Sequence, residues 1–543
     1  MTSTTIEARG RPWARNGAAG SRGKRAEFGF VAAAGRLLAS LALALGLAAC
    51  GGGGGGGSSG SPGEEPGGGP VVTITVTPSS VRLAPRAERT FACTVTGADD
   101  TGCDWSLREG ERGGTIDANG RYQAPQTEGT YHVVATARAD AARQAVATVV
   151  VAAPGGSAVR PWVTAYYAGY FWENGDMQQP QYVDMSTMTH LVFARVAPGG
   201  GTLGGQIGTV VPGGGTAHDP NHPFNPGYVG PNNPQNRSVE RYLIDRAHDA
   251  GIKALLMLGG VGDGEGFAES TAPGMRATFV RNLLDYLDAH DYDGVDVDWE
   301  DNLDEPGLQA QLIDFLTELR ERSAEYPRWS VNPIIITFPG YALNINTDTV
   351  EPWKVTVASL VDQYNMMSYA LSFAAPGWVS SHFSPIAGAK PNRPMDLTSS
   401  VEAYVNAGVP RSKIGIGIGF YAISLPPPVT GPDQAIPPGV WVENDDTSWY
   451  YGRLVRMGYL SNGTLHWDET AGMHYRSYPG GYQPQGGGLT GYLSYEDPDS
   501  IIAKGQWVRR TGVGGAIIWL VNYGSTDGRN NPLMDAVKTG FLQ

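Results

Sequence analysis

Short apolar runs alternate with amphipathic stretches along most of the chain after residue 159. Three of the amphipathic stretches have helical periodicity, at 238–250, 275–290 and 306–323, and the last begins with a proline suited to a first helical turn. The apolar runs predict eight strands, at 162–167, 190–194, 253–258, 294–300, 333–337, 363–369, 413–418 and 515–519.

Repeated strand–helix units predict a parallel sheet, and eight of them favour a (β/α)8 TIM barrel over residues 159–543. These units extend over about 380 residues, so we expect a barrel enlarged by insertions. An open doubly wound sheet is the alternative, although no glycine-rich phosphate loop follows the first strand.

Residues 71–153 have a different pattern, with short alternating segments separated by turn residues, which predicts an all-β sandwich. This segment resembles a bacterial immunoglobulin-like domain, with Trp105 at a core position and Tyr131 at a corner position. A spacer role is favoured over carbohydrate binding, because no exposed row of aromatic residues is evident. Residues 154–157 then predict a second linker.

The N-terminal 50 residues predict export. Basic residues precede a short apolar run at 37–47, which ends in Leu-Ala-Ala-Cys50, and this order is typical of a secretory signal. The run is too short for a membrane span. Leu-Ala-Ala-Cys resembles a bacterial lipobox, which implies lipidation at Cys50 and attachment to the cell envelope through the membrane; an ordinary signal cleaved near Ala49 would leave the protein extracellular. Residues 51–70, rich in glycine, predict a flexible tether.

Composition and cysteine content narrow the function classes. With 41% hydrophobic residues the chain can form a packed core, and a net charge of −14 without a basic stripe argues against a nucleic-acid partner. Cys93 and Cys103 form an even pair in an exported chain and predict one disulfide, between neighbouring strands of a hairpin. No cysteine resembles a metal ligand or catalytic thiol, and we expect a monomer without metal or cofactor.

One predicted strand carries three acids. In Asp293-Gly-Val-Asp-Val-Asp-Trp-Glu300, the side chains of Asp296, Asp298 and Glu300 share one face, and the apolar residues between them share the other. The apolar face must pack on a helix layer, so the acids are expected to point into the barrel. Crowded, desolvated carboxyls cannot all ionise, and at least one should keep a proton near neutral pH. Glu300, at the C-terminal end of the strand, is a candidate general acid. A solvated edge strand and a Mg²⁺ or Ca²⁺ site are the alternatives.

This segment resembles the DGxDxDxE signature of glycoside hydrolase family 18, the chitinases and related enzymes. Other segments resemble the third, sixth, seventh and eighth strands of that family: 253–260, 365–369, 417–421 and 514–519. The resemblance covers most of residues 160–540. The stretch at about 424–490 resembles a reduced form of an insertion that many members carry, which implies a small insertion after the seventh strand.

The resemblance implies a retaining, substrate-assisted mechanism, in which the 2-acetamido oxygen of the sugar attacks its own anomeric carbon. Glu300 would be the general acid and base, and Asp298 would orient the acetamido N–H. Asp296 would share charge and a proton with Asp298. Tyr369 would donate a hydrogen bond to the acetamido oxygen, and Trp519 would form an apolar floor under the sugar.

The implied substrate is a β-1,4-linked N-acetylglucosamine polymer, chitin or its oligosaccharides. Further substrate contacts are expected from Tyr166, Phe193, Met367 and Tyr421. The alternatives are an enzyme of the same mechanism acting on N-glycans or another N-acetylglucosamine-containing glycan, and, in another class, a non-catalytic sugar-binding protein. Such binding proteins usually lack the glutamate that is present here as Glu300.

Three positions depart from the family pattern. Met257 stands where a small serine is common, which removes a hydrogen bond to the inner aspartates. Ala370 stands where an aspartate usually follows the sixth-strand tyrosine, and Asp301-Asn302 replaces a Tyr-Pro pair. These changes leave the acid and the acetamido-orienting aspartate in place. Asp301-Asn302 implies a different local loop, and Met257 and Ala370 imply a pKa of the acid, and a pH optimum, that differ from the usual pattern.

Overall fold

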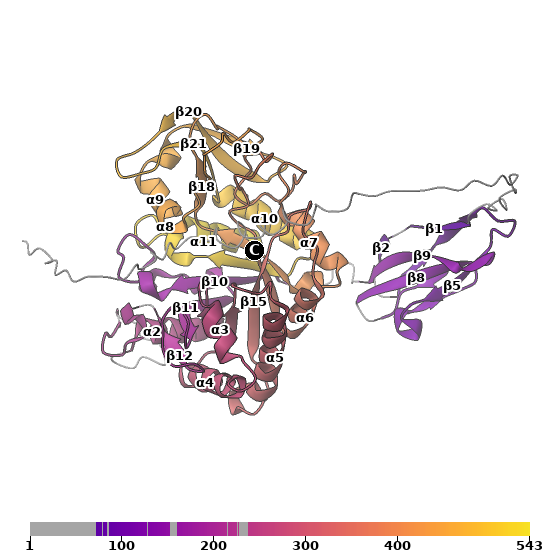
Figure 1. The fold of residues 1–543 in the computed structure, drawn as a ribbon, viewed down its shortest axis with the longest axis horizontal. Helices are drawn as coiled ribbons and strands as arrows, with labels where there is room; N and C mark the ends of the chain where they lie inside the picture. Colours follow the sequence, from indigo (N-terminus) through magenta and orange to yellow (C-terminus); the bar gives the residue numbers. More distant parts are fainter. Residues whose placement is uncertain are drawn as a thin grey trace, which may run out of the picture. The chain divides into compact units, whose positions relative to one another are not determined.

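Eight parallel strands close into a barrel in the computed structural model, which describes residues 72–78, 80–83, 86–126, 129–151, 160–213, 215–224, 226 and 237–543 (Figure 1). The strands are β10 (Trp162–Ala168), β11 (His190–Pro198), β13 (Lys253–Gly259), β14 (Gly294–Asp298), β15 (Ile335–Tyr341), β16 (Gln363–Met367), β17 (Ile414–Gly419) and β22 (Gly515–Trp519). The barrel closes because β10 pairs in parallel with both β11 and β22. The predicted (β/α)8 barrel is therefore confirmed, and the short strand β12 (Val210–Pro212) adds an antiparallel edge to β11.

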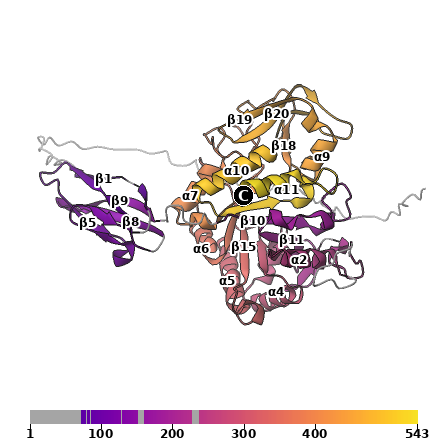
Figure 2. The same ribbon diagram turned by 180° about the vertical axis from the view of Figure 1, so that it is seen from behind.

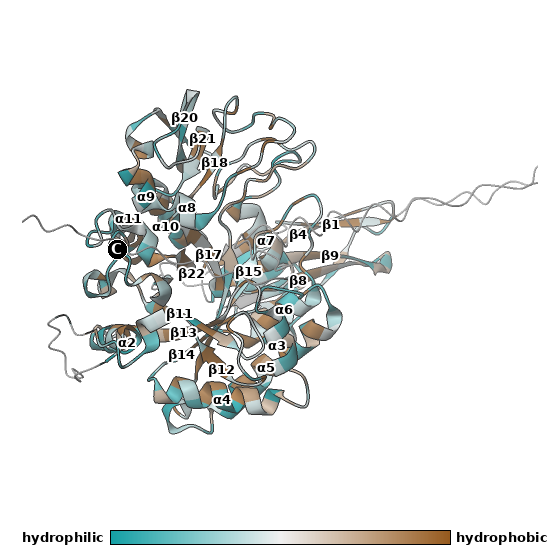
Figure 3. Ribbon diagram, turned by 60° about the vertical axis from the view of Figure 1, so that its left-hand side comes forward, coloured by the Kyte–Doolittle hydropathy of each residue, from teal (hydrophilic) through white to brown (hydrophobic). Residues whose placement is uncertain are grey.

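Helices surround the barrel. The three predicted helices are present as α2 (Val239–Asp249), α4 (Arg276–Ala289) and α5 (Pro306–Ser323), and the others are α3 (Gly264–Ser270), α6 (Pro352–Leu360), α7 (Leu397–Asn406), α10 (Pro498–Thr511) and α11 (Pro532–Val537). Local chemistry sets several helix starts: the Ser238 hydroxyl accepts from the N–H of Arg241, and Asp497 and Ser500 form a capping box on α10. Strand β13 is mainly hydrophobic, whereas α4 and α5 alternate in polarity, as expected of a buried sheet covered by amphipathic helices (Figure 3). Among the described residues, no helix has the length and apolar character of a membrane span.

A small antiparallel sheet is inserted between β17 and β22. It contains β18 (Ala422–Leu425), β19 (Thr464–Asp468), β20 (Met473–Tyr482) and β21 (Thr490–Tyr495), in the order β18-β21-β20-β19. The short helices α8 (Asp446–Trp449) and α9 (Tyr451–Arg456) lie between β18 and β19 along the chain and pack into the same unit (Figure 2).

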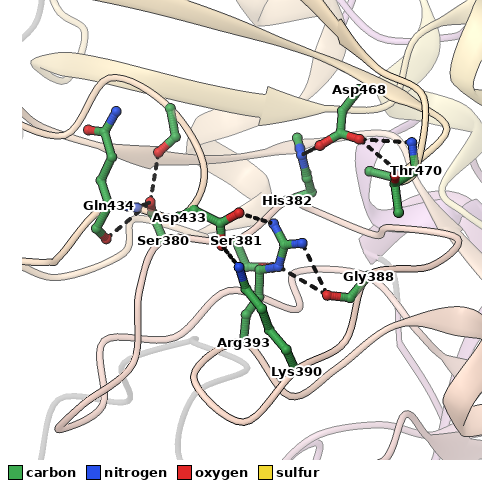
Figure 4. A network of polar contacts seen from close by, with 12 residues as sticks. Ser380, Ser381, His382, Gly388, Lys390, Arg393, Asp433, Gln434, Asp468 and Thr470 are labelled. Carbon is green, nitrogen blue, oxygen red and sulfur yellow. Dashed lines mark hydrogen bonds and ion pairs between the residues drawn. The ribbon is translucent and has the colours of Figure 1, made fainter.

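Polar contacts attach this insertion to the long loop that follows β16 (Figure 4). Asp433 accepts from the Lys390 ammonium at 2.8 Å and from the Arg393 guanidinium at 3.2 Å. The imidazole of His382, which is fully buried, contacts the Asp468 carboxylate at 3.0 Å. Because these pairs join a barrel loop to two separate parts of the insertion, they limit the movement of the insertion over the barrel.

The N-terminal described residues form strands β1 to β9. They are β1 (Thr73–Thr77), β2 (Ser80–Leu83), β3 (Glu88–Thr90), β4 (Ala92–Thr96), β5 (Cys103–Leu107), β6 (Thr115–Ile116), β7 (Arg121–Gln123), β8 (Gly129–Ala137) and β9 (Asp140–Val151). A disulfide joins Cys93 on β4 to Cys103 on β5, with the Cα atoms 6.5 Å apart. The expected hairpin is wrong, since β4 pairs with β1 while β5 pairs with β8; the disulfide links two sheets. Trp105 and Tyr131 contribute to the apolar core of this region.

The predicted signal over residues 1–50, the lipidation site at Cys50, the tether over 51–70 and the linker at 154–157 lie outside the described residues.

Candidate active site

Strand β14 places two aspartates inside the barrel. Asp296 and Asp298 are buried on the inner face. Val295 and Val297, which alternate with them along the strand, are fully buried on the opposite face. The same alternation turns Trp299 outward, where its ring stacks on Phe267 of α3 with centroids 4.9 Å apart. The strand ends at Asp298, two residues before the predicted end, so Glu300 follows the strand at its C-terminal end, where barrel enzymes place their catalytic groups.

Asp296 is held by two hydroxyl donors. The Tyr166 phenol of β10 donates to its Oδ2 at 2.8 Å, and the Thr337 hydroxyl of β15 donates to its Oδ1. Burial raises the pKa of Asp296 to about 6, although both hydrogen bonds act to lower it. Thr337 was not among the predicted site residues; it lies beside Asp296 because β14 and β15 pair in that register. These two donors supply hydrogen bonds at a place where Met257 on β13, the cross-strand neighbour of Asp296, supplies none.

Asp298 and Glu300 share a strongly acidic environment. Burial, with the charges of Glu300 and Asp296, raises the pKa of Asp298 well above its usual value. Burial, with the charges of Asp301 and Asp296, raises the pKa of Glu300 to about 8. Glu300 therefore holds a proton at neutral pH and can deliver it, as the crowding of acids on one strand face predicted.

The Arg195 guanidinium opposes the charge of these acids. Arg195, near the end of β11, has a side chain only 16% exposed, and its Nη1 lies 2.5 Å from Oδ2 of the fully buried Asp263. A Cβ placed on Gly260 would lie 2.8 Å from Arg195 Nη1 and 3.7 Å from Asp298 Oδ2, so the guanidinium and the carboxylate flank the same glycine. The positive charge acts to lower the pKa of Asp298 and of Glu300. No periodic pattern of the sequence predicts Arg195, a charged residue within the mainly apolar strand β11.

Aromatic side chains surround the acids. Tyr369, just after β16, and Tyr421, just after β17, are buried and meet edge to face with ring centroids 5.9 Å apart. Burial keeps the pKa of Tyr369 well above its usual value, so its phenol stays protonated and can donate a hydrogen bond. The Trp519 ring, at the end of β22, lies against Tyr166 with centroids 5.6 Å apart. Met367 ends β16, two positions before Tyr369 and opposite Tyr341 of β15.

Phe193 does not join this group, and its prediction as a substrate contact is wrong. It is fully buried, and its ring packs on Tyr167 and on His218. In the register of β10 and β11, Tyr166 pairs with Val192 and Tyr167 pairs with Phe193. Because Tyr166 points to Asp296, the next position on each strand points outward, and Phe193 belongs to the layer outside the barrel.

The site therefore combines a protonated Glu300, two inner aspartates, a phenol donor and an indole surface, on or just after β14 and near the C-terminal ends of β16 and β22. Within the described part of the chain, no group of three or more His, Cys, Asp or Glu residues is arranged to hold a metal ion. The arrangement can protonate a leaving group, hold a polar group of the substrate between an acceptor and a donor, and cover an apolar ring face.

Known proteins share this arrangement of segments. The family model described as Glycosyl hydrolases family 18 matches residues 165–524. Chitinase 1 of Aphanocladium album is 26% identical over 294 residues, which cover 52% of this chain and 64% of the relative. Chitinase A1 of Niallia circulans is 23% identical over 313 residues, which cover 53% of this chain and 43% of the relative. The matched region thus spans less than two thirds of either chitinase.

Solved structures show the same fold. The Group IV chitinase of Ostrinia furnacalis in complex with allosamidin superposes with a TM-score of 0.53 at 19% identity, covering 70% of this chain and 98% of that one. The chitinase-like agglutinin RobpsCRA of Robinia pseudoacacia gives a TM-score of 0.51 at 17% identity, covering 70% and 99%.

Proposed function

The chain belongs to family 18 of the glycosyl hydrolases, and from this premise we propose that it is a retaining glycosidase acting on β-1,4-linked N-acetylglucosamine polymers. The observation that carries the proposal is the row of Asp296, Asp298 and Glu300, with the Tyr369 phenol close enough to feel the charges of Glu300 and Asp298 and the Trp519 ring packed on Tyr166. The chitinases among its relatives support the choice of substrate.

The first step is proton transfer to the leaving oxygen. Glu300 has a pKa raised to about 8, so the proton is present at neutral pH. As the bond to the anomeric carbon breaks, the 2-acetamido oxygen of the same sugar attacks that carbon and forms an oxazolinium ion. Glu300, now ionised, then accepts a proton from the water that opens this ion, and the two inversions give net retention.

The inner aspartates serve the acetamido group. Asp298 accepts a hydrogen bond from its N–H and stabilises the positive charge that develops there. Asp296, held by Tyr166 and Thr337, shares charge and a proton with Asp298, so Asp298 can be anionic when that charge appears. The Tyr369 phenol supplies the donor for the acetamido oxygen, and Trp519 supplies the apolar floor.

A binding protein of the same fold is the competing function. The protonated Glu300 at the end of β14 favours an enzyme, because a lectin has no need for an acid with a raised pKa beside two buried aspartates. Turnover of chitin oligosaccharides and of an N-glycan, with Glu300→Gln as the inactive comparison, distinguishes the two functions and the two substrate classes. Binding without cleavage of any N-acetylglucosaminide would refute the enzyme.

We also propose that the chain is exported and anchored to the cell envelope through lipid on Cys50, on the basis of the Leu-Ala-Ala-Cys motif. The test is membrane fractionation of the full chain and a Cys50→Ser variant expressed in a bacterium. Equal release of both into the soluble fraction would contradict the anchor.

A further inference from the structure

The insertion contributes a carboxylate to the surroundings of the site. Asp446 is the first residue of α8, and its Oδ2 accepts a hydrogen bond from the Trp519 indole N–H at 2.8 Å. Trp519 ends β22 of the barrel, so this bond joins the insertion directly to the predicted sugar floor.

The Trp519 ring is connected onward to the acids. It lies against Tyr166 at a centroid distance of 5.6 Å and an interplanar angle of 60°. The Tyr166 phenol in turn donates to Asp296 at 2.8 Å. A change in the tilt of the indole would therefore press on a side chain that holds an inner aspartate.

Contacts with the segments that follow two neighbouring barrel strands, β17 and β22, fix the position of α8 and of Asp446. Its neighbour Asp445 caps α8 by accepting from the Thr447 N–H at 3.0 Å. Just beyond the helix, Tyr450 forms a bridge with Tyr421 and stacks on Tyr523 with centroids 5.3 Å apart. The carboxylate is thus held between the segment after β17 and the segment after β22.

From this geometry we propose that Asp446 is a positioning residue, which fixes the Trp519 indole so that its face is presented to the sugar at the reacting position. The inference rests on the proposed function, since it requires a sugar on Trp519. It also assigns a role to the insertion, because α8 supplies the carboxylate that holds the Trp519 indole.

Three substitutions separate this role from a structural one. Asp446→Ala removes the acceptor, Asp446→Asn keeps an oxygen that can accept from the indole, and Asp445→Ala removes the α8 cap without touching Trp519. The measurements are Kd for chitotetraose by calorimetry in a Glu300→Gln background, KM and kcat in the active background, and Tm.

We expect Asp446→Ala to raise Kd and KM about tenfold, as the loss of one hydrogen bond to a charged group implies, with kcat changed less than about threefold. Asp446→Asn should restore both constants to within about threefold of the parent. Asp445→Ala should lower Tm and leave Kd unchanged. The proposal would be overturned if Asp446→Ala left Kd unchanged, or if Asp445→Ala raised Kd as much as Asp446→Ala does.

A double-mutant cycle with Trp519→Phe gives the second test. If Asp446 acts through the indole N–H, Asp446→Ala adds no further rise in Kd once that N–H is absent; independent, multiplicative effects would contradict it. Should Asp446→Ala fail to fold, a parental Kd in Trp519→Phe alone would overturn the proposal. A parent chain that neither binds nor cleaves chitotetraose would refute the proposed function and this inference together. If the parent cleaves chitotetraose and Asp446→Ala has the parental Kd and KM, only the inference is refuted.

Discussion

Neutralising the ion pair of Arg195 and Asp263 should move the pH dependence of catalysis upward. The perturbation is the double substitution Arg195→Gln with Asp263→Asn, because replacing the arginine alone would leave Asp263 as an unpaired buried charge and cost about 3–5 kcal/mol of stability. The amide side chains keep a donor and acceptor at each position while removing both charges.

The magnitude follows from charge and distance. At an effective dielectric constant of about 20, two unit charges about 6 Å apart interact by about 3 kcal/mol. The negative charge of Asp263, which is paired with the same guanidinium, offsets part of this attraction. We therefore expect removal of both charges to change the free energy of ionisation of a nearby carboxyl by about 1.4 kcal/mol, or about one pKa unit. The guanidinium favours the ionised carboxylates, so its loss raises their pKa values.

The assay is kcat/KM for a chromogenic chitobioside from pH 4 to 10. The parent should lose activity as pH rises through the pKa of Glu300, near 8, because the acid must be protonated. In the double variant both limbs of the profile should move up by about one pH unit, and Arg195→Lys, which keeps the charge, should move them by less than half a unit. A basic limb that stays in place or moves down in the double variant would refute this electrostatic role.

Two further predictions concern neighbouring residues. Tyr166→Phe removes a hydrogen bond to a charged group, so kcat should fall roughly tenfold or more and the acidic limb of the kcat profile should move to higher pH, since this bond lowers the pKa of Asp296; a parental profile would contradict that role. Phe193→Ala should lower the free energy of unfolding by about 3–5 kcal/mol in urea denaturation while leaving KM unchanged, because the ring is fully buried outside the barrel; a marked rise in KM with little loss of stability would show that the ring serves the site after all.

The barrel could be predicted from the chain because each of its eight strands is a short apolar run bounded by loops or amphipathic helices. The acids could be predicted as well, since strand alternation alone places Asp296 and Asp298 together and Trp299 opposite them. Phe193 was assigned wrongly because a strand buried on both faces is apolar at every position, and its pattern does not say which side faces the lumen.

Other site residues depend on contacts that no local pattern encodes. Thr337 reaches Asp296 through the register of β14 with β15. The Arg195 guanidinium is held near the acids by Asp263 and by the Gly259 carbonyl, which lie beyond the local pattern of β11. Asp446 is 73 positions from Trp519 along the chain. The prediction that Cys93 and Cys103 lie on one hairpin was wrong for a similar reason: the alternation of a short strand does not reveal which sheet the strand joins.

The most direct test of the account is the anomeric form of the first products released from a chitin oligosaccharide, followed by NMR for the parent and for Glu300→Gln. Participation of the substrate acetamido group predicts β-anomeric initial products from the parent and a fall in kcat of at least about a thousandfold in Glu300→Gln, which cannot donate the proton. Initial α-anomers, or a Glu300→Gln variant that retains parental turnover, would contradict the assignment of Glu300 and of the inner aspartates.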